Sequence, residues 1–60
     1  MKIGDVVNIV YETGEVFNGP VVSIREIPQK GMLVLVNDEV VGHRSVYAHK
    51  CVSAKTLVKA

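Results

Sequence analysis

The sequence has little of what usually stabilises a very small protein through cross-links. Its 60 residues include a single cysteine, which cannot form a disulfide bridge within the chain. A chain of this length buries so little apolar surface that the gain roughly cancels the entropy lost on ordering it. Of the common supplements, which are disulfides, a structural metal and association with another chain, we expect association. The sequence therefore predicts a homo-oligomer or a subunit of a complex.

Long hydrophobic runs are also absent. The longest apolar run, residues 32–36, is far shorter than the roughly 20 residues that cross a bilayer as a helix. The first residues reach an acid at Asp5 and lack the apolar segment and small-residue cleavage site of an export signal. We expect no membrane association and, with a free thiol, a location in the reducing cytoplasm.

Charge is nearly balanced in total and uneven along the chain. The net charge is +1, yet residues 1–39 hold all six acidic side chains and sum to −3, while residues 40–60 sum to +4 without an acid. His43 and His49 lie in the same basic stretch and would add charge under mildly acidic conditions. This distribution allows one basic surface, unless the strands of the fold interleave the two halves.

Valine is the commonest residue and, with isoleucine, favours strands, because β-branched side chains fit a pleated sheet better than a helix. The first expected strand covers residues 5–11, with Val7, Ile9 and Tyr11 on one face and Ile3 extending that inward set. Turn residues between positions 12 and 20 predict a long loop that folds back through Asn18-Gly19. The remaining strands are expected at residues 21–27, 32–37, 43–47 and 51–54.

Short connections join these later strands. Residues 28–31 read Pro-Gln-Lys-Gly and predict a hairpin turn, and Asp38-Glu39 begins the next turn. Residues 48–50 have the length of one helical turn, and residues 55–60 are expected to form a tail. Five short strands in one domain of residues 1–60 predict an all-β, closed or nearly closed small barrel.

The opening of the chain resembles a known group of small barrels. The segment Lys2-Ile3-Gly4-Asp5-Val6-Val7, a loop with Gly14 and Gly19, and then Val21-Val22-Ser23-Ile24 resemble the KOW-type and other Src-homology-3-like barrels. The resemblance implies a five-stranded barrel with a one-turn helix before the last strand, although Pro20 stands where the family has glycine. Such barrels serve as ribosomal and transcription-factor modules, as peptide-binding modules and as subunits of complexes, so the resemblance implies binding without naming the ligand.

The third strand is apolar on both faces, with Leu33 and Leu35 on one side. A strand with one face in water should alternate, so a neighbouring strand or another chain must cover the second face. We therefore predict a non-enzymatic protein-interaction module that self-associates or docks on a larger complex. The residues expected to bind protein are Met32, Val34, Val36, Val40 and Val41.

Nucleic-acid binding is the alternative function. It requires a basic face and, for single strands, aromatic side chains on which bases stack. The chain has three aromatic residues, Tyr11, Phe17 and Tyr47, and Phe17 could instead close the end of the barrel while Tyr47 packs in its core. The residues expected to bind nucleic acid are Arg44, Tyr47, His49, Lys50, Lys55, Lys59 and Phe17.

The patterns of catalytic and metal sites are incomplete. His43, His49 and Cys51 could supply three zinc ligands, but a structural site needs four. His49 and Cys51 lack a third group to orient them for nucleophilic catalysis, and the glycines are too isolated to form a phosphate-binding loop. Residues 44–47, Arg-Ser-Val-Tyr, share only the tyrosine with the Val-Gln-Ile-Tyr strand of the plasmid-type dihydrofolate reductases. We expect no enzyme activity, no cofactor and no metal.

Overall fold

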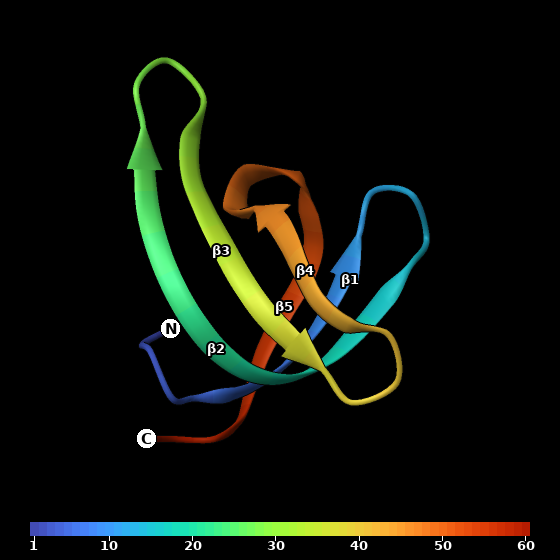
Figure 1. Cartoon of the computed structure of the whole chain (residues 1–60). Helices are drawn as coiled ribbons and strands as arrows, with labels where there is room; N and C mark the ends of the chain where they lie inside the picture. The colour runs from blue at the N-terminus through green and yellow to red at the C-terminus, as the bar shows by residue number, and fades with distance from the viewer.

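The computed structural model describes residues 1–60 and consists of a five-stranded antiparallel sheet with one short helix (Figure 1). The elements are β1 (Val6–Tyr11), β2 (Val16–Ile27), β3 (Gly31–Asp38), β4 (Gly42–Tyr47), the 3-10 helix η1 (Ala48–Lys50) and β5 (Cys51–Val58). The predictions of an all-β chain, five strands and one helical turn before the last strand are confirmed. With three residues, the only helix is too short to cross a membrane.

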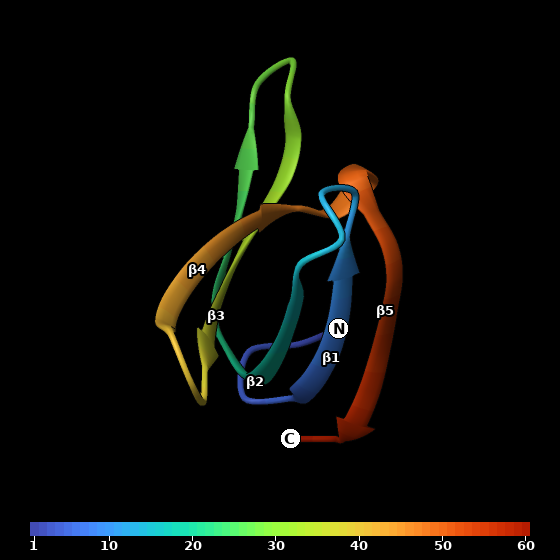
Figure 2. The ribbon, with the colours of Figure 1, turned by 90° about the vertical axis from the view of Figure 1, so that its right-hand side faces the viewer.

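Hydrogen-bonded neighbours follow the order β4-β3-β2-β1-β5, so β4 and β5 are the two edges of the sheet. The twelve-residue strand β2 belongs to both halves: its first part pairs with β1, with Phe17 opposite Ile9, and its second part pairs with β3, with Ile24 opposite Val34. Figure 2 shows the resulting curvature, with β4 on one side of the molecule and β5 on the other. No strand pairing joins these two edges.

The core lies between the two halves of the curved sheet. Strand alternation sends every second side chain inward, so β1 contributes Val7 and Ile9, and β3 contributes Val34 and Val36. Tyr11, Ile24 and Cys51 pack at its margin. The full set of buried apolar residues is Val7, Ile9, Phe17, Val21, Val34, Val36 and Val46.

The loop predicted over residues 12–20 is wrong beyond Glu15. The turn ends there, where the Tyr11 N–H donates to the Glu15 carbonyl at 2.9 Å, and Val16 begins β2. Gly19 is therefore a strand residue and is buried. A Cβ at Gly19 would overlap the carbonyl oxygen of Asn37 and lie 2.8 Å from its carbonyl carbon, so glycine is needed for close backbone approach and not for a turn.

Two further boundaries differ from the prediction. Ile3 is 60% exposed and does not extend the inward set, because residues 3 and 4 form a turn before β1. The expected tail is largely strand: β5 runs to Val58, which pairs with Val6. The strand continues because β1 offers pairing groups along its whole length.

Two buried carboxylates, those of Asp5 and Asp38, accept hydrogen bonds from backbone N–H groups near the ends of the strands. Asp38 accepts hydrogen bonds from the N–H groups of Asn18, Val40 and Val41 at 2.7, 2.9 and 3.0 Å. Asp5 accepts from the N–H groups of Ala60 at 2.7 Å and Lys2 at 2.9 Å, so it ties the two chain ends together. Backbone donors favour the charged form, and they lower the pKa of both carboxyls below the ordinary value of 3.8 despite their desolvation.

Candidate functional site

The five residues predicted to bind protein do not form one surface. Val34 and Val36 are core residues, because their alternation points them inward. Met32 is exposed at the start of β3, whereas Val40 and Val41 are exposed in the turn that follows its other end. The structure therefore does not bring this predicted set together.

The outward face of β3 explains why both sides of this strand are apolar. Leu33 and Leu35 are only partly exposed. In register, Leu33 lies between Arg25 and Tyr47 of the neighbouring strands, and Leu35 lies between two serines. Cross-strand neighbours share a face of the sheet, so side chains of the same chain flank these leucines.

Exposed apolar side chains gather elsewhere, on β5. Val52 is 74% exposed, and Leu57 and Val58 are each 60% exposed. Val52 and Leu57 fall at two irregularities of the ladder, where β5 has a residue without a partner on β1. Because β5 pairs only with β1, its outer edge is free of backbone partners. The prediction of a strand ending at residue 54 missed this edge, although the apolar pair Leu57-Val58 was the available signal.

A hollow lies beside the β3–β4 turn. It has a volume of about 360 Å³, and the exposed apolar residues Val16, Val40 and Val41 line it. Its charged groups come from Glu15, Asp38, Glu39 and Arg44. This hollow and the β5 edge are separate surfaces.

The residues predicted to bind nucleic acid are divided among several places. Phe17 is 5% exposed in the core, so its ring is not presented to a base. Arg44 lines the hollow beside the β3–β4 turn, Lys55 lies on β5 opposite Asn8, and Lys59 lines a hollow at the chain ends. The basic residues after position 40 thus do not form one face.

Three members of that set do come together. Tyr47, His49 and Lys50 line a hollow of about 260 Å³, and Lys30 from the β2–β3 hairpin completes it. The rings of Tyr47 and His49 have centroids 5.8 Å apart, and the Lys50 Nζ lies 5.7 Å from the centroid of Tyr47. Sequence spacing could not have identified Lys30, because its approach depends on the pairing of β3 with β4.

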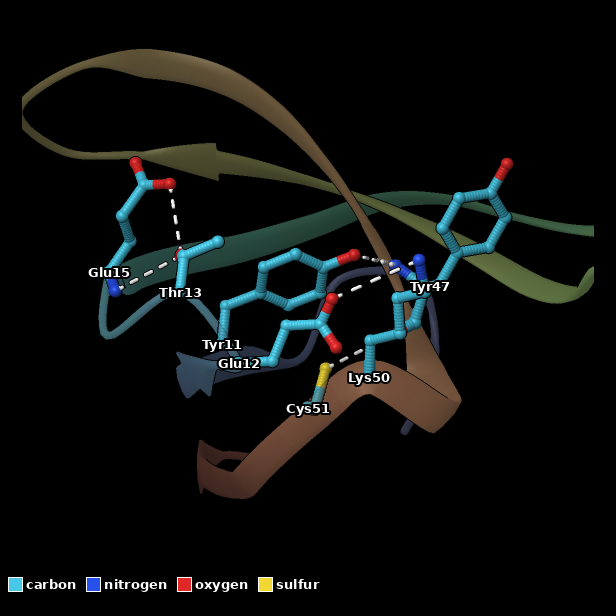
Figure 3. A network of polar contacts seen from close by, with 7 residues as sticks. All are labelled: Tyr11, Glu12, Thr13, Glu15, Tyr47, Lys50 and Cys51. Atoms are coloured by element: carbon cyan, nitrogen blue, oxygen red, sulfur yellow. Dashed lines mark hydrogen bonds and ion pairs between the residues drawn. The ribbon is translucent and has the colours of Figure 1, made fainter.

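Polar contacts hold the backbone of this corner in place (Figure 3). The Tyr47 N–H donates to the Tyr11 Oη at 3.3 Å, and the Cys51 thiol donates to the Tyr47 carbonyl at 3.4 Å. Lys50 forms an ion pair with Glu12 at 3.8 Å. Partial burial raises the pKa of the Cys51 thiol, which disfavours the reactive thiolate.

His43, His49 and Cys51 do not form a cluster. The chain contains no group of three or more His, Cys, Asp or Glu side chains arranged to hold a metal ion. Cys51 faces the backbone of Tyr47, and His49 lies at the lysine-lined hollow.

Comparison with known proteins identifies no relative. No protein-family model matches the chain, and neither a curated protein nor a solved structure matches it. The chain is a small all-β protein with five antiparallel strands, and its own surfaces are the basis for assigning a function.

Proposed function

We propose that the protein is a non-enzymatic interaction module of the Src-homology-3-like small-barrel type, and that it self-associates through the outer edge of β5. The strand order, the long β2 shared by both halves of the sheet and the 3-10 turn before β5 support the barrel type. The observation that carries the interaction role is the edge of β5, which combines unpaired backbone groups with exposed Val52, Leu57 and Val58.

The balance of buried and exposed apolar residues supports association. Seven apolar side chains form the core, whereas ten large ones are exposed. Scattered exposed apolar residues are ordinary on protein surfaces. Three of these ten lie on β5, which is an edge strand, and an apolar edge strand is a template for pairing with another chain.

A second copy of this chain is the partner that fits this edge, because β5 is complementary to itself. Two antiparallel strands related by a two-fold axis place residues of the same face opposite each other, so the axis passes through a residue and not between two. With Ala54, near the centre of the strand, on the axis, this small residue lies opposite its own copy. Val52 of one copy then lies opposite Thr56 of the other and Cys51 lies opposite Leu57, each twice by symmetry, and no two lysines lie opposite each other. Apolar and hydroxyl pairs of this kind stabilise antiparallel sheets.

Light scattering coupled to size exclusion, over a range of protein and salt concentrations, tests the proposal. We expect a dimer whose mass does not respond to salt, since the contacts are apolar and backbone contacts. Val52→Asp should dissociate the dimer. An unpaired buried polar group costs about 1–3 kcal/mol, and a symmetric dimer would contain two such groups, so dimerisation should weaken by at least about 30-fold.

Val40→Asp is the matched control, because Val40 is 85% exposed in a turn, where aspartate is well tolerated. This variant should remain dimeric. Leu57→Asp provides an independent second test if Val52→Asp does not fold. A folded protein that is monomeric at every concentration refutes the proposal, as does a dimer that both β5 variants leave intact.

A further inference from the structure

The corner where β4 runs into η1 carries a hollow with an aromatic and cationic lining. Tyr47, His49 and Lys50 follow one another along this segment, and Lys30 reaches the same hollow from the tip of the β2–β3 hairpin. Its volume is about 260 Å³. Neither the core nor the β5 edge accounts for this grouping of side chains.

Tyr47 has a fixed backbone and an outward ring. Its N–H and its carbonyl each have a side-chain partner, Tyr11 and Cys51. Its neighbour Val46 is buried in the core, so strand alternation directs Tyr47 to the opposite face. Figure 3 shows the ring pointing away from the side chains that hold its backbone. A ring held in this way can serve as a platform for a flat ligand.

Two lysines share the hollow with this ring. The Lys50 Nζ lies 5.7 Å from the ring centroid, and Lys30 lines the same hollow. In register, Arg25 and Tyr47 flank Leu33 on the same face of the sheet. The ion pair of Lys50 with Glu12 joins side chains that are 43% and 52% exposed, and such exposed pairs are weak. An anionic ligand can therefore compete for Lys50.

We propose that this hollow binds a nucleotide unit, with its base stacked on Tyr47 and its phosphate between Lys30 and Lys50, and that the unit belongs to a single-stranded nucleic acid. The proposal is independent of self-association through β5. A base needs an aromatic face and a phosphate needs cations, and both lie here within one hollow. The rings of Tyr47 and His49 are tilted by 48°, so a base stacked on Tyr47 meets the imidazole at an angle, as a flanking contact.

Fluorescence anisotropy with a labelled single-stranded oligonucleotide, at low salt, tests the site in the full-length protein. We expect Tyr47→Leu to weaken binding at least about fivefold through lost stacking, whereas Tyr47→Phe should bind like the wild type. Lys50→Gln and Lys30→Gln should each weaken binding. Two neutralised phosphates, one between the two lysines and a flanking one at Arg25, predict a loss of roughly sevenfold when salt rises fourfold, because about 0.7 counterion is released per phosphate.

Lys59→Gln is the matched control, since Lys59 lies after the end of β5 and lines a separate hollow at the chain ends, and the change removes the same charge. Equal losses for Lys59→Gln and Lys50→Gln mean that only net charge matters, and they refute the site. Equal affinity of Tyr47→Leu and Tyr47→Phe refutes stacking. Val52→Asp should retain oligonucleotide binding, which separates this test from that of self-association.

Two competitors identify the source of the ligand. A free mononucleotide should displace the oligonucleotide only weakly, because it lacks the flanking phosphates, for which Arg25 on the same face of the sheet is the available cation. A mononucleotide that competes as well as the oligonucleotide overturns the assignment to a single strand. An acidic peptide of the same charge that binds equally well, with no effect of Tyr47→Leu, overturns the nucleotide site. Absence of oligonucleotide binding at low salt also overturns it.

Discussion

Replacing Gly19 with alanine should destabilise the protein more than any other glycine-to-alanine change. Gly19 lies in the first part of β2, where this strand crosses the end of β3. An added Cβ would overlap the carbonyl oxygen of Asn37, approach its carbonyl carbon to 2.8 Å and lie 3.3 Å from the Asp38 Cα. All three are backbone atoms, so no rotamer change can relieve the clash.

Relief requires the two strands to separate. That movement would stretch the hydrogen bond from the Glu39 N–H to the Asn18 carbonyl, now 3.0 Å long. Overpacking a closely packed site costs about 1–3 kcal/mol and sometimes more, and a rigid backbone contact puts this site at the upper end. A 60-residue chain has a stability of only about 3–9 kcal/mol at typical values per residue. Gly19→Ala should therefore remove about a third or more of the free energy of unfolding.

Urea denaturation followed by circular dichroism, at one fixed protein concentration, measures this effect. Gly14→Ala is the matched control: its φ of +90° is strained for alanine, yet no atom lies within 4 Å of the added Cβ. Strain of that kind costs about 1–2 kcal/mol. Gly19→Ala should lower the free energy of unfolding by more than Gly14→Ala does, although Gly19 has no positive φ. A Gly19→Ala protein as stable as Gly14→Ala, or within about 1 kcal/mol of the wild type, refutes the close-approach explanation.

Three other predictions concern single groups. The pKa values of Asp5 and Asp38 are lowered from 3.8, so their contribution to stability is present above that pH and is lost as the pH falls through the folded-state pKa values. Urea titrations from neutral to acid pH should show this loss of stability. Asp38→Asn should make the free energy of unfolding depend less on pH. Tyr11→Phe removes the acceptor of the Tyr47 N–H and should cost about 0.5–1.5 kcal/mol in the urea midpoint analysis; an unchanged midpoint contradicts that bond. Burial raises the pKa of the Cys51 thiol, so iodoacetamide should modify it more slowly in the folded protein than in urea, and equal rates would show that the thiol is not protected.

Local sequence patterns predicted the strands well wherever they depend on alternation and turn chemistry. Val7 and Ile9 lie inward as expected, and Pro28 to Gly31 form a turn in which Gln29 and Gly31 adopt positive φ. The helical turn of residues 48–50 was also predicted correctly. These features involve a few neighbouring residues, so the information for them is contiguous in the chain.

The prediction of a turn at Asn18-Gly19 was wrong because it used a rule about neighbouring residues, whereas contacts with residues far away in the chain determine the conformation there. An Asn-Gly pair is typical of a tight turn, yet here Gly19 pairs with Val7 in the sheet and faces the backbone of Asn37. In the same way, Val34 and Val36 looked available for a partner because their strand is apolar on both sides. Their burial depends on which face of β3 the curved sheet turns inward.

By itself, the sequence determined an all-β chain, the number of its strands and the place of its helical turn, because these depend on side-chain alternation and on turn residues close in the chain. Only the tertiary structure decided which apolar residues remain exposed on β5 and which cations accompany Tyr47. Those outcomes depend on the pairing of β5 with β1, and on the approach of the hairpin residue Lys30 to the end of β4. Contacts between residues far apart in the chain follow from the register and curvature of the whole sheet, and no short segment encodes them.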